Sequence, residues 1–389
     1  MRFLYRSSPW RALFAGESLP DPAGLSSGLA PALAPLLAPL VEALERLGPT
    51  PSLAAAKAWQ LELVEALMRL DLPAWRISQL ISDHGHWLYR QAVATSLDDM
   101  LATGWGPPPR PYCVLVLGSM ARHESLLAPD QDNAMIIGDY PDARHSEVDG
   151  YFQALGERFT DRLAAAGLPL CQGHVMARWP MWRKRLSEWD AQLAIWSAER
   201  RVKRVQQTNI LLDFAAVYGD AGLADSLRDR ALARLARAGG FLDEMADLLE
   251  ETPVALDRLG RLHGDDKEAP QSGALNLKRQ GLIPLQNAVR LMSVLYGCRG
   301  VDTRLRLSEL VCAGALDARE ALTLHTAMNR LQAILLATQC RRLGAGGLAD
   351  GWVVLADLDE AEQTLLRLDL KAIRRLVGRA KDLVGASSH

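Results

Sequence analysis

The hydrophobic and polar positions divide the chain into a helical part, a mixed part and a second helical part. From 52 to 101, apolar residues recur at helical spacing, as in "AWQLELVEALMRL" and "WRISQLISDHGHWLYRQAV", which predicts amphipathic helices. The earlier stretch "GLAPALAPLLAPLVEALERLG" mixes prolines with a leucine stripe, and we expect it to become helical near Leu36. The segment 104–111, "GWGPPPRP", ends this part, because a run of prolines cannot continue a helix.

A second pattern, short apolar runs closed by glycine, aspartate or proline, predicts strands. The four runs are "YCVLVLG" (112–118), "NAMIIGD" (133–139), "LPLCQGHVMA" (168–177) and "NILLDFAAVYGD" (209–220). Helices are expected over 150–167 and over the tryptophan-rich stretch 179–207. Alternation of strands and helices on this scale predicts a small mixed sheet with helices packed on it.

After Gly222 the pattern is helical again, over 223–251, 281–297, 318–343 and 359–384, with the main loop at 262–273. We therefore predict an α+β protein whose small mixed-sheet domain is flanked by helical regions. The predicted domains are an N-terminal helical region at 1–104, a small mixed-sheet domain at 105–222 and a C-terminal helical domain at 223–389.

Composition narrows the class of protein without naming a function. The 389 residues are 49% hydrophobic and 23% charged, and the net charge of −2 provides no general attraction to nucleic acid or anionic membranes. The five cysteines form no CxxC pair, which argues against a disulfide framework or a structural zinc site. No apolar run has the roughly 18 to 20 residues needed to span a bilayer. These features favour a cytoplasmic protein that does not enter the membrane.

The candidate chemistry lies in "GSMARHESLLAPDQDNA", residues 118–134. Gly118 allows a tight turn after the first strand, and Ser119 is a favourable helix N-cap. A helix N-terminus of this kind offers backbone N–H groups to a phosphate. Asp130 and Asp132 follow at positions i and i+2, which on a strand puts both carboxylates on one face and Gln131 on the other. Two such carboxylates beside a phosphate suit Mg²⁺, with Mn²⁺ as an alternative.

This order of strand, Gly-Ser, spacer, Asp-x-Asp and strand resembles the signature of the DNA polymerase beta-type nucleotidyltransferase superfamily. The form found here is similar to a narrower group, the nucleotidyltransferases that accompany CBS and cyclic-nucleotide-binding domains in bacterial signalling proteins and are related to the P-II uridylyltransferase. The resemblance extends through 171–182, 211–220 and 275–297 and covers roughly residues 55 to 345.

The chain departs from the group at three positions of the motif. Ala121 stands where glycine is typical, Ser125 where glutamine is typical, and Pro129 where a small polar residue is usual. None of these changes removes a carboxylate. No CBS or cyclic-nucleotide module is recognised in the first fifty residues, so regulation is expected to come from a partner or from the short leader.

The resemblance implies a Mg²⁺-dependent transfer of a nucleoside monophosphate from an NTP, ATP or UTP, to an acceptor, with release of pyrophosphate. It also implies that the acceptor is a signalling protein. Asp130 and Asp132 would hold the metal, and Gly118 and Ser119 would hold the β- and γ-phosphates. Superfamily members commonly carry a third carboxylate on a later strand, for which Asp213 is the candidate; the alternative is a structural hydrogen bond at a strand end.

Four further residues are candidates for nucleotide contacts, each beside a structural alternative. Arg122 could touch a phosphate and Glu124 could support the loop, or the two could form a local salt bridge. Lys278 and Arg290 lie in the block that matches the helical domain of the family, where they could meet a phosphate or simply occupy a helix surface.

Other clusters point elsewhere. Trp182, Trp189 and Trp196 are seven residues apart, which indicates one helix face packed on a core. Basic residues interleaved with aromatic ones can bind a nucleic-acid strand, but a core face with a solvated basic side is favoured over contact with a triphosphate or with RNA. The basic neighbours of the tryptophans are Arg183, Lys184, Arg185, Arg200, Arg201, Lys203 and Arg204. The "HGH" at 84–86 is a poor zinc spacing without an accompanying cysteine or carboxylate cluster. Two alternatives to an NTP-dependent protein-modifying enzyme stay open, a non-catalytic nucleotide sensor and a small-molecule nucleotidyltransferase.

Overall fold

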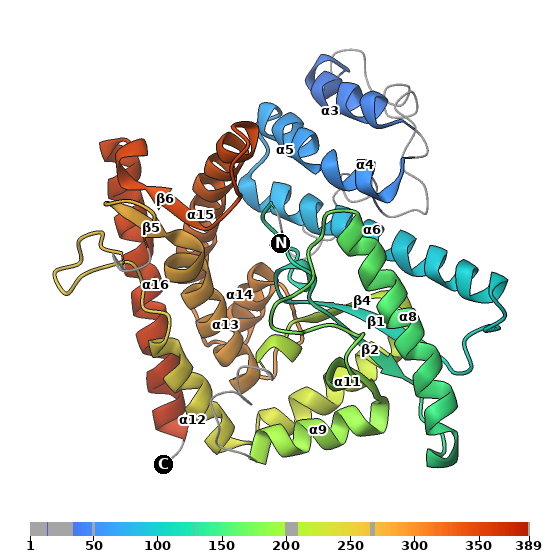
Figure 1. Cartoon of the computed structure of the whole chain (residues 1–389). Coiled ribbons are helices and arrows are strands. Elements are labelled where there is room, and N and C mark those ends of the chain that lie inside the picture. The colour runs from blue at the N-terminus through green and yellow to red at the C-terminus, as the bar shows by residue number, and fades with distance from the viewer. Residues whose placement is uncertain are drawn as a thin grey trace.

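A four-stranded sheet lies between two groups of helices, and a second helical region packs against its edge (Figure 1). The computed structural model describes residues 14, 34–48, 51–127, 129–198, 209–264 and 269–387. The predicted α+β class and the small mixed sheet are confirmed. The buried residues form one continuous cluster from the N-terminal helices to the last helix, so the predicted division into three domains stays a prediction.

The N-terminal helices are α3 (Ala34–Leu47), α4 (Leu53–Ala58), α5 (Gln60–Arg69) and α6 (Ala74–Ala102). They confirm the helical pattern predicted over 52–101, whereas most of the proline-rich leader lies outside the described residues. The long α6 ends just before Gly104, which has a φ of 86°, and the proline run that follows. Most of α6 is buried, because it packs on α8, on β4 and on the C-terminal helix α15 (Ala318–Gly344).

The sheet consists of β1 (Tyr112–Leu117), β2 (Asn133–Ile137), β3 (Arg183–Arg185) and β4 (Phe214–Gly219), in the order β3-β2-β1-β4. β1 runs antiparallel to both neighbours, and β2 and β3 are parallel. Val116 pairs with Asn133 and Leu117 pairs with Phe214. This register brings the end of β1 and the starts of β2 and β4 to one edge of the sheet, where the motif residues lie.

The third predicted strand, 168–177, is wrong. This run forms a loop that makes a single bridge, Gln131 to Leu170, and turns at His174, which has a φ of 58°. Most of its apolar residues are buried without strand pairing, although Leu170 is 39% exposed, so burial rather than a ladder explains the pattern. The strand that pairs with β2 is instead β3, which lies inside the stretch predicted as helix. The helix of that stretch, α9 (Leu186–Ala198), starts directly after β3.

Helices cover both faces of the sheet (Figure 1). α6 and α8 (His145–Ala165) lie on one face, and α9 and α11 (Ala221–Leu235) on the other. The short helix η2 (Asp142–Arg144) leads into α8, and η3 (Pro180–Trp182) leads into β3. The burial expected for the three tryptophans is confirmed, with ring centroids 6.2 to 6.5 Å apart, but the single helix face is wrong: Trp189 and Trp196 lie on α9, and Trp182 lies in η3.

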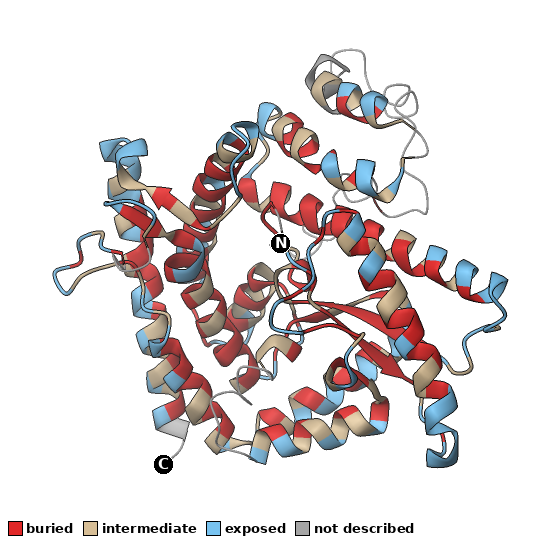
Figure 2. Ribbon diagram, viewed as in Figure 1, coloured by how far each residue is buried: buried red, intermediate tan, exposed pale blue. Residues whose placement is uncertain are grey.

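The C-terminal region is helical apart from one small ladder, in which β5 (Ala274–Asn276) pairs antiparallel with β6 (Trp352–Val354). Buried residues line the sides on which its helices face one another (Figure 2). Besides α15, its elements are α12 (Gly239–Asp247), η4 (Leu248–Glu250), η5 (Lys278–Leu282), α13 (Ile283–Leu295), α14 (Thr303–Cys312), η6 (Leu355–Asp357) and α16 (Glu360–Ser387). None of the described helices is long and apolar enough to cross a membrane.

Candidate active site

The end of β1 is held in a conformation that only glycine adopts without strain. Gly118 has a φ of 61°, and its backbone N–H donates a hydrogen bond of 2.9 Å to the carbonyl oxygen of Asp213. One residue earlier, the N–H of Leu117 donates to the carbonyl oxygen of Asp132 over 3.0 Å. A Cβ added at Gly118 would lie 3.5 Å from Oδ2 of Asp132. The turn therefore brings backbone N–H groups close to the predicted metal-binding carboxylate.

Ser119 does not cap the helix as we predicted. The helix α7 (Gly118–Ala121) spans one turn, its N-cap is Leu117, and no side chain caps it. Ser119 is the second residue of that turn, and its carbonyl oxygen accepts a 2.9 Å hydrogen bond from the N–H of Glu124. The reason is that the chain enters the helical conformation one residue before the serine. Ser119 still belongs to the first helical turn, whose backbone N–H groups have no partner within the helix.

Asp130 and Asp132 lie in the segment that enters β2 rather than within the strand. Gln131 between them is fully buried, and its side-chain NH₂ donates to the carbonyl oxygens of Thr160 and Leu168 over 2.9 and 2.8 Å. Asp130 is exposed and Asp132 is half-buried. The alternation predicted for i and i+2 therefore holds ahead of the strand: the amide points into the protein, and the two carboxylates lie together.

A cysteine that the sequence did not single out completes this group. Oxygen atoms of Asp130 and Asp132 and the sulfur of Cys171 all lie within 4.8 Å of one another. The thiol donates a hydrogen bond to Asp132. Burial, with the charge of Asp130 beside it, raises the pKa of Asp132 to about 6, and burial also raises the pKa of Cys171 to about 11. The bridge that Gln131 makes to the neighbouring loop brings the cysteine here.

Asp213 has different neighbours from those that a third metal-binding carboxylate would need. Its side chain is 1% exposed and accepts hydrogen bonds from three arginines. Oδ2 receives Arg122 Nη1 at 2.6 Å and Arg290 Nε at 3.0 Å, and Oδ1 receives Arg306 Nη1 at 2.7 Å. Burial favours the neutral acid, but the three guanidinium groups outweigh it and hold the pKa of Asp213 well below its usual range.

This network corrects the expectation that Asp213 shares a metal with Asp130 and Asp132. Among the described residues, the group that could hold an ion at this place consists of the two aspartates and Cys171, without Asp213. Asp213 also precedes β4 instead of lying within it. The physical reason is charge: with both oxygens bound by arginines, Asp213 is an ionised anchor for cations of the protein itself.

Arg122 and Glu124 belong to the same buried network. Arg122 Nε donates to Glu124 Oε2 over 2.9 Å, which is the local salt bridge considered for this pair. Glu124 also accepts from Gln286 Nε2 and from the backbone N–H of Thr303, both at 2.7 Å. Gln286 and Thr303 come from α13 and α14, so the turn after α7 is bonded directly to the C-terminal helices.

One pocket brings the predicted site residues together. It has a volume of about 490 Å³ and lies between the edge of the sheet and the helices η4, η5 and α13. Its lining includes all nine candidates: Gly118, Ser119, Arg122, Glu124, Asp130, Asp132, Asp213, Lys278 and Arg290. Lys278 opens a π-helical turn, a rare conformation that often occurs at functional sites, and its charge lowers the pKa of Asp132.

The pocket also contains residues that sequence reasoning missed. Gln286 and Asn287 lie on the same helix as Arg290, and Glu251 lies at the end of η4. Three basic and five acidic side chains line the pocket, a formal charge of −2. Glu124 and Asp213 are buried, whereas Asp130 and Glu251 are exposed and Asp132 is half-buried. The two neighbouring carboxylates of Asp130 and Asp132 suit a cation at that point of the pocket.

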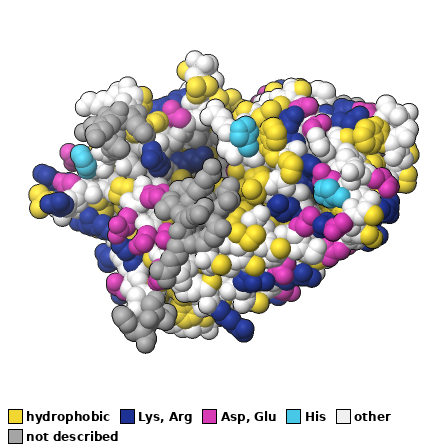
Figure 3. Space-filling model, turned by 60° about the horizontal axis from the view of Figure 1, so that its bottom comes forward, with side chains coloured by type: hydrophobic (Ala, Val, Ile, Leu, Met, Phe, Trp, Pro, Cys, Tyr) yellow, Lys and Arg dark blue, Asp and Glu magenta, His cyan; other side chains and the backbone are white. Residues whose placement is uncertain are grey.

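The described basic residues around the tryptophans, Arg183, Lys184 and Arg185, do not line this pocket. Arg183 is buried and pairs with Asp149, and Arg185 pairs with Asp142 and Glu188. The residues Arg200, Arg201, Lys203 and Arg204 lie outside the described part of the chain. On the face of the molecule in Figure 3, the described basic and acidic side chains are interspersed, an arrangement typical of a solvated surface.

Comparison with known families agrees with this geometry. Residues 59–203, which include the motif, match the family described as "Putative nucleotidyltransferase DUF294". Residues 239–382, which include Lys278 and Arg290, match the family described as "Putative nucleotidyltransferase substrate binding domain". A search of curated proteins finds no match to the chain. Since the two matched segments follow one another and together cover most of the chain, the protein belongs to this family of nucleotidyltransferases.

Proposed function

We propose that the protein is a Mg²⁺-dependent nucleotidyltransferase that moves a nucleoside monophosphate from ATP or UTP to an acceptor and releases pyrophosphate. The observation that carries the proposal is the pocket itself. It joins the glycine turn after β1, the aspartate pair ahead of β2 and cationic side chains of the C-terminal helices around one space. A triphosphate needs this combination of backbone donors, cations and metal ligands.

The residues present fit a hard divalent cation. Asp130 and Asp132 offer carboxylate oxygens, the donors that Mg²⁺ prefers, and they leave room for substrate phosphates as further ligands. The Cys171 thiol is a soft donor, and it is engaged as a hydrogen-bond donor to Asp132. When bound, Mg²⁺ would neutralise charge on the triphosphate and favour departure of pyrophosphate.

The chain's own residues would orient the nucleotide. The N–H groups at the start of α7 and the Lys278 ammonium would hold the β- and γ-phosphates, which leaves the α-phosphate close to Asp130 and Asp132. The acceptor hydroxyl would attack the α-phosphorus, a new P–O bond would form, the bond from the α-phosphorus to the bridging oxygen would break with release of pyrophosphate, and the hydroxyl proton would pass to solvent. Asp213 would take no part in these bonds; it would position Arg122 and Arg290 at the wall of the pocket.

One observation favours a second candidate function, a nucleotide sensor without catalysis. In the sensor, occupancy of the pocket would be relayed to a partner through the contacts of the α7 turn with α13 and α14. The supporting observation is that Asp213, the candidate third carboxylate, is bound by arginines instead of standing beside the aspartate pair. For either function we propose a signalling role with a protein partner, by analogy with the bacterial signalling group that the motif resembles.

Two measurements on the full chain test the proposal. Calorimetry of MgATP and MgUTP binding should show an affinity that depends on Mg²⁺ and is lost in Asp130→Asn/Asp132→Asn. The matched control is Asp98→Asn/Asp382→Asn, which removes the same charge from exposed positions of α6 and α16 outside the pocket. Equal binding by the aspartate variant and the control would overturn the site.

Incubation with α-labelled ATP or UTP and proteins of a cell extract then separates enzyme from sensor. An enzyme leaves label covalently on an acceptor and releases pyrophosphate, and the Asp130→Asn/Asp132→Asn variant leaves none. A protein that binds MgNTP through the aspartates but transfers no label to protein or small-molecule acceptors is the sensor.

A further inference from the structure

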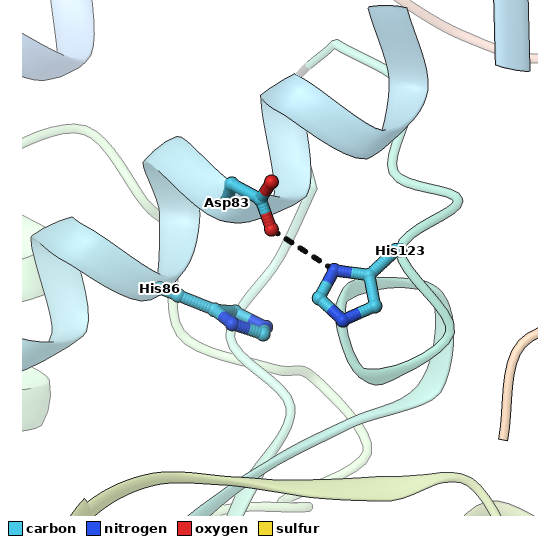
Figure 4. A group of neighbouring side chains, drawn as sticks. All are labelled: Asp83, His86 and His123. Atoms are coloured by element: carbon cyan, nitrogen blue, oxygen red, sulfur yellow. Dashed lines mark ion pairs between the residues drawn. The ribbon is translucent and has the colours of Figure 1, made fainter. Parts of the chain in front are cut away.

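A second group of metal-binding side chains lies behind the glycine turn, outside the nucleotide pocket. Asp83 and His86 come from α6, and His123 comes from the turn that follows α7. The three side chains converge on one point (Figure 4). Nδ1 of His123 lies 3.2 Å from Oδ1 of Asp83, the rings of His86 and His123 are 5.0 Å apart, and one ligand atom of each residue lies within 4.8 Å of the others.

The local sequence explains how the group forms. Asp83 and His86 are three residues apart on a helix and therefore share a face. Gly85 lets α7 approach closely, since a Cβ there would lie 2.9 Å from Cε of Met120. His123 has a φ of 57°, a value that is uncommon for residues other than glycine, although histidine, asparagine and aspartate adopt it more often than the rest. The group thus combines a close helix contact with an unusual backbone conformation that presents an imidazole.

The hydrogen bonding of His86 is that of a metal ligand. Its Nε2 lies 3.2 Å from the carbonyl oxygen of Met120. A carbonyl only accepts, so Nε2 carries the proton and Nδ1 carries the lone pair. Metal-bound histidines commonly donate their second nitrogen to a carbonyl in this way.

We propose that Asp83, His86 and His123 bind a divalent transition-metal ion of the Zn²⁺ type. Two imidazoles and one carboxylate suit Zn²⁺ and not Mg²⁺, which prefers oxygen ligands. Tetrahedral coordination at zinc-ligand distances places neighbouring ligand atoms about 3.3 Å apart, close to the 3.2 Å between Asp83 and His123. The site corrects the expectation that no carboxylate accompanies the histidines of "HGH": His86 has Asp83 one turn away, whereas His84 packs among Phe14, Trp59 and Trp87.

The position of His123 bears on how an ion would reach this group and on how a bound ion would affect the fold. His123 lines a second cavity, of about 580 Å³, together with Ala121 and Asp302. An ion and a fourth ligand would reach the group from the side of His123. Its chain neighbours are Arg122 and Glu124, which line the nucleotide pocket. An ion bound to α6 and His123 would hold the α7 turn in place and stabilise the fold by RT ln(1 + L/Kd), where L is the free ion concentration.

The test uses full-length protein carrying Asp130→Asn, Asp132→Asn and Cys171→Ser, which removes the other candidate metal group. After dialysis against equal concentrations of Zn²⁺, Mn²⁺ and Mg²⁺, we expect one Zn²⁺ per chain by elemental analysis. Co²⁺ in place of Zn²⁺ should give the visible absorption of a four-coordinate site. The midpoint temperature of thermal unfolding should rise when Zn²⁺ is added and should fall back when a chelator removes the ion.

His123→Asn removes the imidazole and keeps a residue that tolerates the positive φ. The matched control is His174→Asn, since His174 also has a positive φ, 58°, and lies outside the group. We expect His123→Asn and Asp83→Asn to weaken Zn²⁺ binding at least tenfold and His174→Asn to leave it unchanged. Zn²⁺ binding that is absent, or equal in His123→Asn and its control, overturns the site and leaves Asp83 and His123 as a hydrogen-bonded pair.

Discussion

Arg306 on α14 donates a 2.7 Å hydrogen bond to Asp213 at the start of β4, and side-chain exposure is 5% for the arginine and 1% for the aspartate. The same guanidinium group donates through Nε to the carbonyl oxygen of Gly300 over 2.8 Å. With Arg122 and Arg290 on the other carboxylate oxygen, Asp213 joins the glycine turn, the sheet and the C-terminal helices. The pocket wall is therefore built on a buried cluster of charges, in which Asp213 is the common counter-charge of three arginines.

Replacement of Asp213 by asparagine should reduce the free energy of unfolding by about 3 to 5 kcal/mol, because three buried guanidinium groups would lose their common counter-charge. Urea unfolding followed by circular dichroism measures the change. The control is Asp142→Asn, which breaks an ion pair with Arg185 at a side chain that is 88% exposed, and we expect little change there. Equal losses of unfolding free energy in the two variants would show that the buried cluster contributes no more to stability than an exposed ion pair.

The pH dependence of stability should report the same cluster. The pKa of Asp213 is lower in the folded chain than in the unfolded chain, so its contribution is complete above the unfolded pKa of about 4 and is lost as pH falls below it. Below that pH the unfolded state binds one more proton at this position. The free energy of unfolding should then fall by up to about 1.4 kcal/mol per pH unit from this group. The slope between pH 4 and pH 3 should be smaller in Asp213→Asn than in the wild type.

Gly118→Ala should affect both stability and nucleotide binding. A side chain at a φ of 61° costs roughly 1 to 2 kcal/mol, and the added Cβ would meet Oδ2 of Asp132 at 3.5 Å. Gly297→Ala is the matched control: its φ is 64°, and nothing lies within 4 Å of the added Cβ. Both variants should lose similar stability in urea, but only Gly118→Ala should weaken MgATP binding in calorimetry. Unchanged binding in Gly118→Ala would remove this turn from the phosphate site.

The residues of the candidate site could be predicted from the short motif more completely than the strands of the sheet could be predicted from the apolar pattern. Gly118, Asp130 and Asp132 lie within 15 residues of one another, and the β1–β2 pairing that places them is local. Asp213 was placed in the pocket correctly, but its partner Arg306 is 93 residues away, and no sequence pattern shows which arginine an isolated acid will meet.

The third strand failed for a related reason. An apolar run such as 168–177 is buried in either a strand or a packed loop, and only the pairing partner decides which of the two forms. That partner, the edge of β2, is taken by Arg183–Arg185. Cys171 was not predicted as a site residue for the same reason: it lies in this loop, and only the course of the loop brings it to Asp132.

Metal binding at the aspartate pair should weaken in mild acid, and Cys171 should set the midpoint. With a raised pKa of about 6, Asp132 is mostly protonated at pH 5, so protons compete with Mg²⁺. We expect the affinity for Mg²⁺ to fall about tenfold between pH 7 and pH 5 and to be constant above pH 7. Titration calorimetry at several pH values measures the midpoint.

The thiol of Cys171 donates to the ionised form of Asp132 and so lowers its pKa, against the effect of burial. Cys171→Ala removes the donor and should move the midpoint of Mg²⁺ binding to higher pH. Cys171→Ser keeps an O–H donor in nearly the same place and should leave the midpoint near that of the wild type. If alanine and serine gave the same midpoint, the thiol would be a neighbour of the pair without influence on it. A midpoint shift in alanine alone would show that the cysteine tunes the carboxylate that holds the metal.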